Sequence, residues 1–158
     1  MNTSKRAAIL IVALFTIMLT ACGGTGIYVS ELNDNMADMA DEFDQVSPWL
    51  EMLAKNPGWN APDGYSRAST RYWVVVLNSC STIADTGPPP KKAAALYQEA
   101  MLMCGDLKHM TEYMGEVYDV QSGKTQKETI RLLFDSMGKA TSHINKYTGL
   151  LELYYINN

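Results

Sequence analysis

The stretch LYQEAMLMCGDLKHMTEYMGEV, residues 96–117, carries apolar side chains in a heptad-like rhythm. Its apolar positions follow one another at intervals of four and three residues: Leu96, Ala100, Met103, Leu107, Met110, Met114 and Val117. Because an α-helix has about 3.6 residues per turn, this spacing places all of them along one side of a helix. Helices with one apolar side bury it against other helices, so the stretch predicts one member of a helical bundle.

Two further segments repeat the rhythm and predict two more helices. In the first segment the apolar positions are Leu32, Met36, Met39, Phe43, Val46, Leu50 and Leu53. In the last segment they are Ile130, Leu133, Met137, Ala140, Ile144, Tyr147, Leu151 and Tyr154. Residues 56–58 (NPG) and 87–90 (GPPP) are typical of helix ends and linkers, and residues 125–128 (TQKE) form a capping box that starts the last helix.

The segment from about Ser66 to Asp85 is ambiguous from its sequence. Tyr72, Val76, Ser79 and Ile83 fit a helical side, whereas YWVVVL at 72–77 is also typical of a strand. A lone strand among three helices would have no partner, which favours a helix. Within the first helix, Pro48 indicates either a kink or a restart capped by Ser47. The sequence therefore predicts an all-α, up-and-down four-helix bundle over residues 30–158.

The amino-terminal segment has the features of a secretion signal. Lys5 and Arg6 precede an uncharged, mostly apolar run at 7–18, which is shorter than the roughly 20 residues that a transmembrane helix needs. The run ends in LTAC at 19–22, which resembles the lipobox of bacterial lipoproteins. The resemblance covers residues 1–22 only. It implies that residues 1–21 are a cleaved signal peptide and that Cys22 carries a diacylglyceryl group, with fatty acids such as palmitate.

The lipobox resemblance also implies a location. Two acyl chains anchor a protein durably, whereas one does so only marginally, so Cys22 is expected to hold the protein on a membrane of the cell envelope. Residues 22–29, which include three glycines, are expected to form a flexible tether. Lipoproteins of two-membrane bacteria that stay at the inner membrane tend to have Asp after the cysteine. Gly23 therefore implies the outer membrane, at its periplasmic face or its surface, if the host has two membranes.

The composition of the mature chain limits its partners. Without residues 1–21 the chain has 137 residues, which suit one domain, and it keeps 11 basic and 17 acidic residues, a net charge of −6. An acidic surface is repelled by phosphate backbones, so we expect no nucleic acid as partner.

Two cysteines remain after Cys22 is assigned to lipid. In an oxidising envelope, Cys80 and Cys104 are expected either to form a disulfide or to stay as two buried thiols. An antiparallel pair of helices ending at Asp85 and starting at Pro90 would place Cys104 near Arg71, about nine residues or roughly 13 Å from Cys80. The disulfide therefore requires the second helix to stop near Cys80, with the proline segment running alongside the third.

Several residue clusters suggest metal binding, but each has a simpler explanation. The first helix is acidic at Glu31, Asp34, Asp38, Asp41, Glu42, Asp44 and Glu51, which favours a solvated helix side over a cation site. Methionines together with His109 suggest a soft metal such as Cu(I), but the methionines mostly fall on the apolar stripes and are better explained as core residues. Asp106 and His109 resemble half of a di-iron site, and the second half is missing because Ala140 stands three residues before His143.

We expect a non-catalytic, lipid-anchored interaction module that binds another envelope protein, with no cofactor, no metal and no catalytic residues. Trp49, Trp59 and Tyr65 around the first loop could form a docking patch, since aromatic side chains dominate interface energetics, or they could close the end of the bundle. The alternative function is a periplasmic soft-metal (copper) binding protein that uses methionine and histidine residues.

Overall fold

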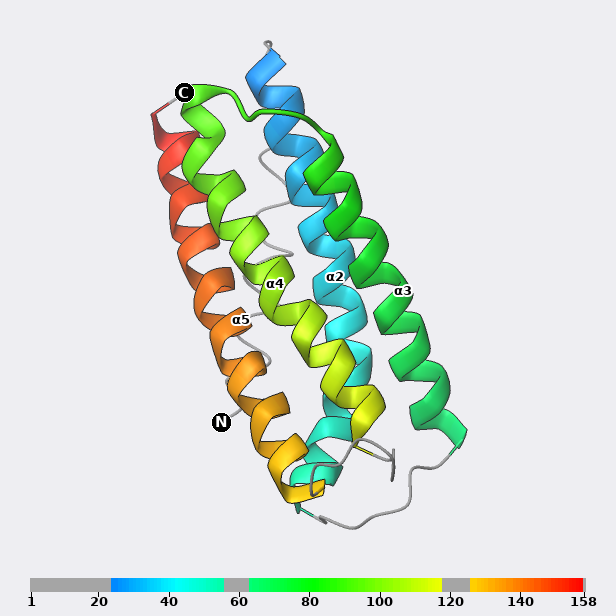
Figure 1. Cartoon of the computed structure of the whole chain (residues 1–158). Helices are drawn as coiled ribbons and strands as arrows, with labels where there is room; N and C mark the ends of the chain where they lie inside the picture. Colours follow the sequence, from blue (N-terminus) through cyan, green and yellow to red (C-terminus); the bar gives the residue numbers. More distant parts are fainter. Residues whose placement is uncertain (1–23, 56–62, 118–125, 158) are drawn as a thin grey trace.

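The computed structural model describes residues 24–55, 63–117 and 126–157. Four long helices make up nearly all of these ranges: α2 (Gly24–Lys55), α3 (Asp63–Asp85), α4 (Ala94–Glu116) and α5 (Gln126–Ile156). A short 3-10 helix, η2 (Lys91–Ala93), precedes α4 (Figure 1). These ranges contain no strand, and residues 72–77 belong to α3. The predicted all-α four-helix bundle is confirmed.

Each helix packs mainly against its neighbour in the sequence, and these neighbours are antiparallel. Between α3 and α4, Tyr65 bonds to Met114 and Cys80 bonds to Cys104, so positions rise on one helix as they fall on the other. The first turn of α2, η2 and the last turns of α5 consequently lie at one end of the bundle, at the top of Figure 1. We call this the amino-terminal end of the bundle.

The core follows the apolar stripes closely in three helices. All seven stripe positions of α4 are buried, as are six of the seven in α2, where Phe43 is half-buried. In α3 the four expected positions are buried together with Tyr65 and Cys80. The stripe of α5 is displaced. Thr129 and Ser136 are buried there, whereas Ile130, Met137 and Ile144 are half-buried.

Helix α2 departs from the sequence-based expectation at both Gly24 and Pro48. The helix begins at Gly24, and Val29 is fully buried, so most of the flexible tether expected over residues 22–29 is helical instead. Val29 packs in the core, and this packing outweighs the conformational freedom of the glycines. The helix also continues through Pro48 without a restart at Ser47. Pro48 and Asp44, whose carbonyl receives no hydrogen bond from a proline, are both exposed, so water can reach this turn.

The linker between α3 and α4 determines the register of these two helices. Helix α3 runs to Asp85 rather than stopping near Cys80, so that expectation is wrong. Residues 86–90 instead continue past the end of α3, with Gly87 at φ +83°, before η2 begins (Figure 1). Five extended residues span up to roughly 16 Å. This length is enough to shift α4 along α3 by about 13 Å, the distance that separated Cys80 from Cys104 in the register expected from the sequence.

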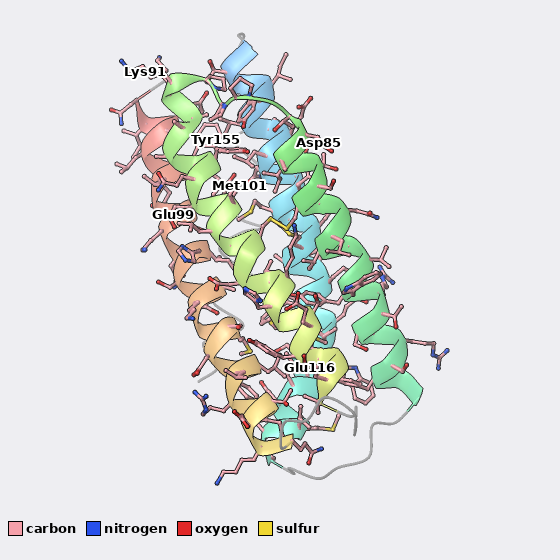
Figure 2. The ribbon with its side chains drawn as sticks, in the orientation of Figure 1. Asp85, Lys91, Glu99, Met101, Glu116 and Tyr155 are labelled. Carbon is pink, nitrogen blue, oxygen red and sulfur yellow. A yellow bond between two sulfur atoms is a disulfide. The ribbon has the colours of Figure 1, made fainter. Side chains whose placement is uncertain are left out.

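This offset brings Cys80 and Cys104 together. Their Cα atoms lie 5.7 Å apart, within the usual range for a disulfide, and their sulfur atoms are bonded to each other inside the core (Figure 2). Of the two expected outcomes, the disulfide is the one found. The bond ties the last third of α3 to the middle of α4.

Candidate interaction surface

The outer side of α3 carries apolar side chains that the core does not use. Trp73 and Val74 directly follow the buried Tyr72, and a step of 100° per residue turns them outward; they are 47% and 42% exposed. Close to them is a shallow depression of about 380 Å³, lined by Ser66, Arg67, Thr70, Arg71, Val74 and Val75. We call these six residues and Trp73 the α3 surface. Exposed tryptophan beside valine marks a candidate contact site for another protein.

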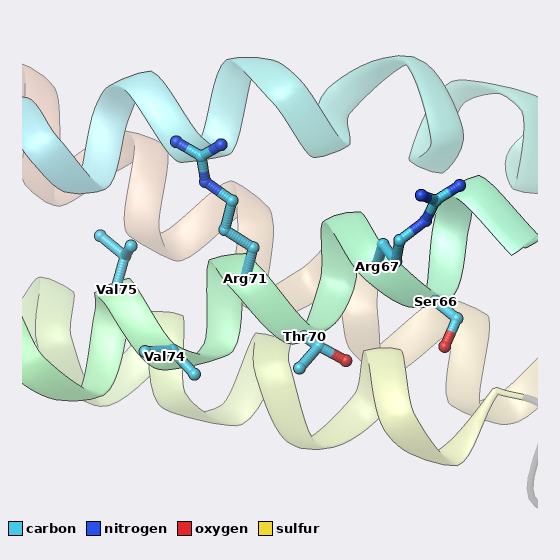
Figure 3. A pocket seen from close by; sticks show the side chains of 6 residues that line it. All are labelled: Ser66, Arg67, Thr70, Arg71, Val74 and Val75. Carbon is cyan, nitrogen blue, oxygen red and sulfur yellow. The ribbon is translucent and has the colours of Figure 1, made fainter.

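Two arginines give the α3 surface a positive edge. In Figure 3, Arg67 and Arg71 extend toward α2 from successive turns, whereas Thr70 and Val74 lie on the side nearer α4. Arg71 forms an ion pair with Glu42 of α2. No salt bridge to Arg67 is found within the residues that the structure describes. Arg67 is therefore a positive charge available to an approaching carboxylate.

The ion pair between Arg71 and Glu42 is asymmetric. The side chain of Glu42 is only 8% exposed, whereas that of Arg71 is 65% exposed. Glu42 also accepts a hydrogen bond of 3.3 Å from the side chain of Gln45. The acidic side of α2 was expected to be solvated, and Asp34, Asp38 and Asp41 are indeed exposed. Glu42 differs because it turns toward α3, where Arg71 covers it.

Replacing Arg71 by alanine should destabilise the fold measurably. Glu42 would lose its partner while remaining largely buried, which we expect to lower the free energy of unfolding by about 1–2 kcal/mol, less than for a fully buried pair because Arg71 is in contact with solvent. Urea unfolding at neutral pH measures the loss. Arg67→Ala is the matched control, one turn away and without a salt bridge, and should change stability by less than about 0.5 kcal/mol. Equal losses in both variants would contradict the assigned pairing.

The aromatic residues expected around the first loop mostly close the end of the bundle. Tyr65 is buried, and its hydroxyl donates to the carbonyl oxygen of Met114 at 3.2 Å. Trp49 is half-buried, and its ring lies so close to Gly64 that a Cβ there would be only 3.0 Å from two of its atoms. Trp59 lies outside the described residues. Of the two interpretations, closure of the bundle end therefore holds for Trp49 and Tyr65.

A polar cluster that the sequence did not reveal joins α4 to α5. The Nδ1 atom of His143 lies 2.6 Å from Glu99, and its Nε2 atom lies 3.5 Å from Asp106. All three side chains are less than one-fifth exposed. Glu99 and Asp106 are seven residues apart and each stands directly before a core position of α4, which is where interhelical ion pairs form in heptad helices. The seven-residue spacing of Glu99 and Asp106 is the sequence feature from which an interhelical ion pair could have been predicted.

This cluster connects two helices, because one histidine of α5 contacts two carboxylates of α4. The two carboxylates contact opposite edges of the imidazole ring, and a doubly protonated ring can donate to both at once. They do not converge on one point, and the described residues hold no group of three His, Cys, Asp or Glu side chains arranged to bind a metal. Asp106 thus pairs with His143 rather than with His109.

The histidine and the methionines that a soft-metal site would use differ in their exposure to solvent. His109 is exposed, contacts Glu112 at 3.2 Å and stacks on Tyr113. The stripe methionines of α2 and α4 are buried instead. The sulfur of Met110 accepts a hydrogen bond from Tyr72 at 3.9 Å, and that of Met39 lies 3.7 Å from the sulfur of Cys80. These contacts are those of core side chains.

The predicted lipid-attachment residue Cys22 lies outside the described residues, as does the capping residue Thr125. None of the helices in the described ranges is both long and apolar enough to span a membrane. No protein-family model, no curated protein and no solved structure matches this chain.

Proposed function

We propose that this protein is a lipid-anchored, non-catalytic interaction module of the bacterial cell envelope. Its anchor would be Cys22, on the strength of the LTAC sequence at 19–22 and the preceding signal-like segment. In a two-membrane host, Gly23 favours the outer membrane. The observation that carries the interaction role is the α3 surface, where Trp73 and Val74 are exposed beside the unengaged charge of Arg67.

The chemistry of the α3 surface favours a particular kind of partner. Tryptophan and valine favour apolar side chains, and an arginine beside them favours a carboxylate. We therefore propose that the partner is an envelope protein that presents an acidic segment with apolar residues. Electrostatic attraction would guide this segment to the positive edge, and burial of Trp73 would supply most of the affinity.

The anchor is tested by Cys22→Ser. Cells fed with labelled palmitate should incorporate the label into the native chain and not into the variant, and the native chain should fractionate with membranes. The variant should lose this membrane association, because it has no acyl chain. Incorporation of equal label into both chains would contradict Cys22 as the attachment residue.

The interaction role is tested by photocrosslinking in cells. A photoreactive amino acid at Val74 should give one adduct of defined mass, and the same group at Met52, exposed at the end of α2, should not. Trp73→Ala and Arg67→Glu should each reduce the adduct at least tenfold, while the unfolding midpoint stays within the range of surface substitutions. Equal crosslinking from Val74 and Met52, or an adduct insensitive to Trp73→Ala, would contradict this surface as the docking site.

A further inference from the structure

The three most exposed large apolar side chains of the described residues lie at the amino-terminal end of the bundle. Ile27, in the first turn of α2, is 62% exposed, and Leu153 and Ile156, in the last turns of α5, are 56% and 78% exposed. The described helices place these turns at the same end of the bundle (Figure 1). Isolated exposed apolar residues are normal on a protein surface, but three such residues at one end of the bundle favour an apolar or interfacial environment there.

Basic and aromatic side chains accompany these apolar residues. Lys91 lies at the same end and is exposed (Figure 2). Lys92 lines a depression of about 340 Å³ together with Leu150, Leu153 and Tyr154. Tyr154 and Tyr155 pack edge to face with ring centres 5.5 Å apart. Two exposed acidic side chains oppose these lysines at the same end, Glu152 on the last turns of α5 and Asp85 at the end of α3 (Figure 2). Apolar, aromatic and lysine side chains together are typical of protein segments at the interface between lipid and water.

The chain length between Cys22 and the bundle restricts where this end can be. Helix α2 already begins at Gly24, so a single residue separates it from the proposed lipid-bearing cysteine. Two Cα–Cα steps span at most about 7.6 Å. A flexible tether of eight residues would instead have allowed a typical separation of roughly 16 Å. With the short connection, the amino-terminal end of the bundle cannot move away from the lipid headgroups.

We propose that the amino-terminal end of the bundle docks directly on the phospholipid surface. Ile27, Leu153 and Ile156 enter the region of the headgroups, and Lys91 faces lipid phosphate. The proposal rests on the proposed acylation of Cys22, which fixes this end as the one facing the membrane. The bundle then stands on the membrane with its axis pointing outward, and the α3 surface lies toward the far end.

The test uses the full-length, acylated chain with one nitroxide label, reconstituted in vesicles of phosphatidylethanolamine and phosphatidylglycerol. The label is attached to Ile156→Cys. The matched control is Met52→Cys, 37% exposed at the opposite end of α2. Cys80 and Cys104 do not react because they form a disulfide, and the thiol of Cys22 is acylated. Accessibility to oxygen, which is enriched in lipid, is compared with accessibility to a water-soluble nickel complex.

We expect the oxygen-to-nickel accessibility ratio to be at least threefold higher at Ile156→Cys than at Met52→Cys. Adding Lys91→Glu should lower the ratio at Ile156→Cys. Equal ratios at the two positions, in a chain that is acylated and floats with the vesicles, would overturn the docking proposal alone. A chain without acyl groups that does not float would overturn the proposed function and this inference together. Spectral broadening at Ile156→Cys that disappears on dilution with unlabelled chain would show that a second copy covers this end, which also overturns the proposal.

Discussion

Replacing Cys80 and Cys104 by alanine is expected to lower the free energy of unfolding by about 3 kcal/mol. The bond joins residues 24 positions apart, and closing a loop of this length removes conformational freedom from the unfolded chain. Both residues are also buried, at 1% and 2% exposure, so the loss of two sulfur atoms reduces packing between α3 and α4. Because small domains are stable by only about 5–15 kcal/mol, the loss is a large fraction of the total.

Urea unfolding with and without a thiol reductant measures this effect. The native chain should lose stability when reductant is added, whereas the double alanine variant should be unaffected by it. A single Cys80→Ala variant serves as control, since it also lacks the bond and should behave like the double variant. If reductant left the native chain unchanged, the disulfide would not contribute to stability in solution.

Alkaline pH is expected to unfold the protein through two buried tyrosines. Burial raises the pKa of Tyr72 far above its ordinary value near 10, and burial, with smaller contributions from Tyr155, Asp34 and Tyr28, raises that of Tyr147. Above pH 10 the unfolded chain loses these protons while the folded chain keeps them. The unfolded state then binds fewer protons, so stability falls as pH rises, with a limiting slope of about 2.7 kcal/mol per pH unit for the two groups.

Urea midpoints measured between pH 8 and 11.5 test this expectation. The midpoint should stay nearly level to about pH 9.5 and then decrease. Tyr72→Phe and Tyr147→Phe should each remove about half of the tyrosine contribution, and the double variant nearly all of it. Tyr113→Phe would be a poor control because Tyr113 is half-buried and stacks on His109, so the comparison is made among the single and double variants. An unchanged alkaline slope in the double variant would contradict the role of these two tyrosines.

Hydrophobic periodicity predicted most of the core but not all of it. On α4 the apolar residues are also the buried ones, at every position of the stripe. On α5 they separate, since α4 and α5 have the most extensive backbone contact of any two helices in the described residues. Close approach favours small side chains, so Ser136 and Thr129 are buried while the larger Met137 and Ile144 pack at the margin. A pattern based on hydropathy detects apolar residues and does not detect small ones.

Contacts between helices depend on register, which no local pattern contains. The direction of residues 86–90 set the offset that allows the Cys80–Cys104 bond, and proline content alone did not indicate it. The pairing of His143 with Glu99 and Asp106 was missed for the same reason. It joins α4 to α5, whereas the motif considered, Asp106 and His109, lies within α4 alone. Trp73 and Val74 could have been found, since their outward position follows from the helical phase of Tyr72 and Val76.

The packing of each helix on its sequence neighbour has a kinetic consequence. Almost all close approaches join α2 with α3, α3 with α4, or α4 with α5, and few join the two outermost helices. Chains dominated by such local pairings have low contact order, and helical bundles of this kind fold in microseconds to milliseconds. Hairpins can therefore form one after another as the polypeptide emerges, and the contacts of α5, chiefly with α4, form last because they need the final helix.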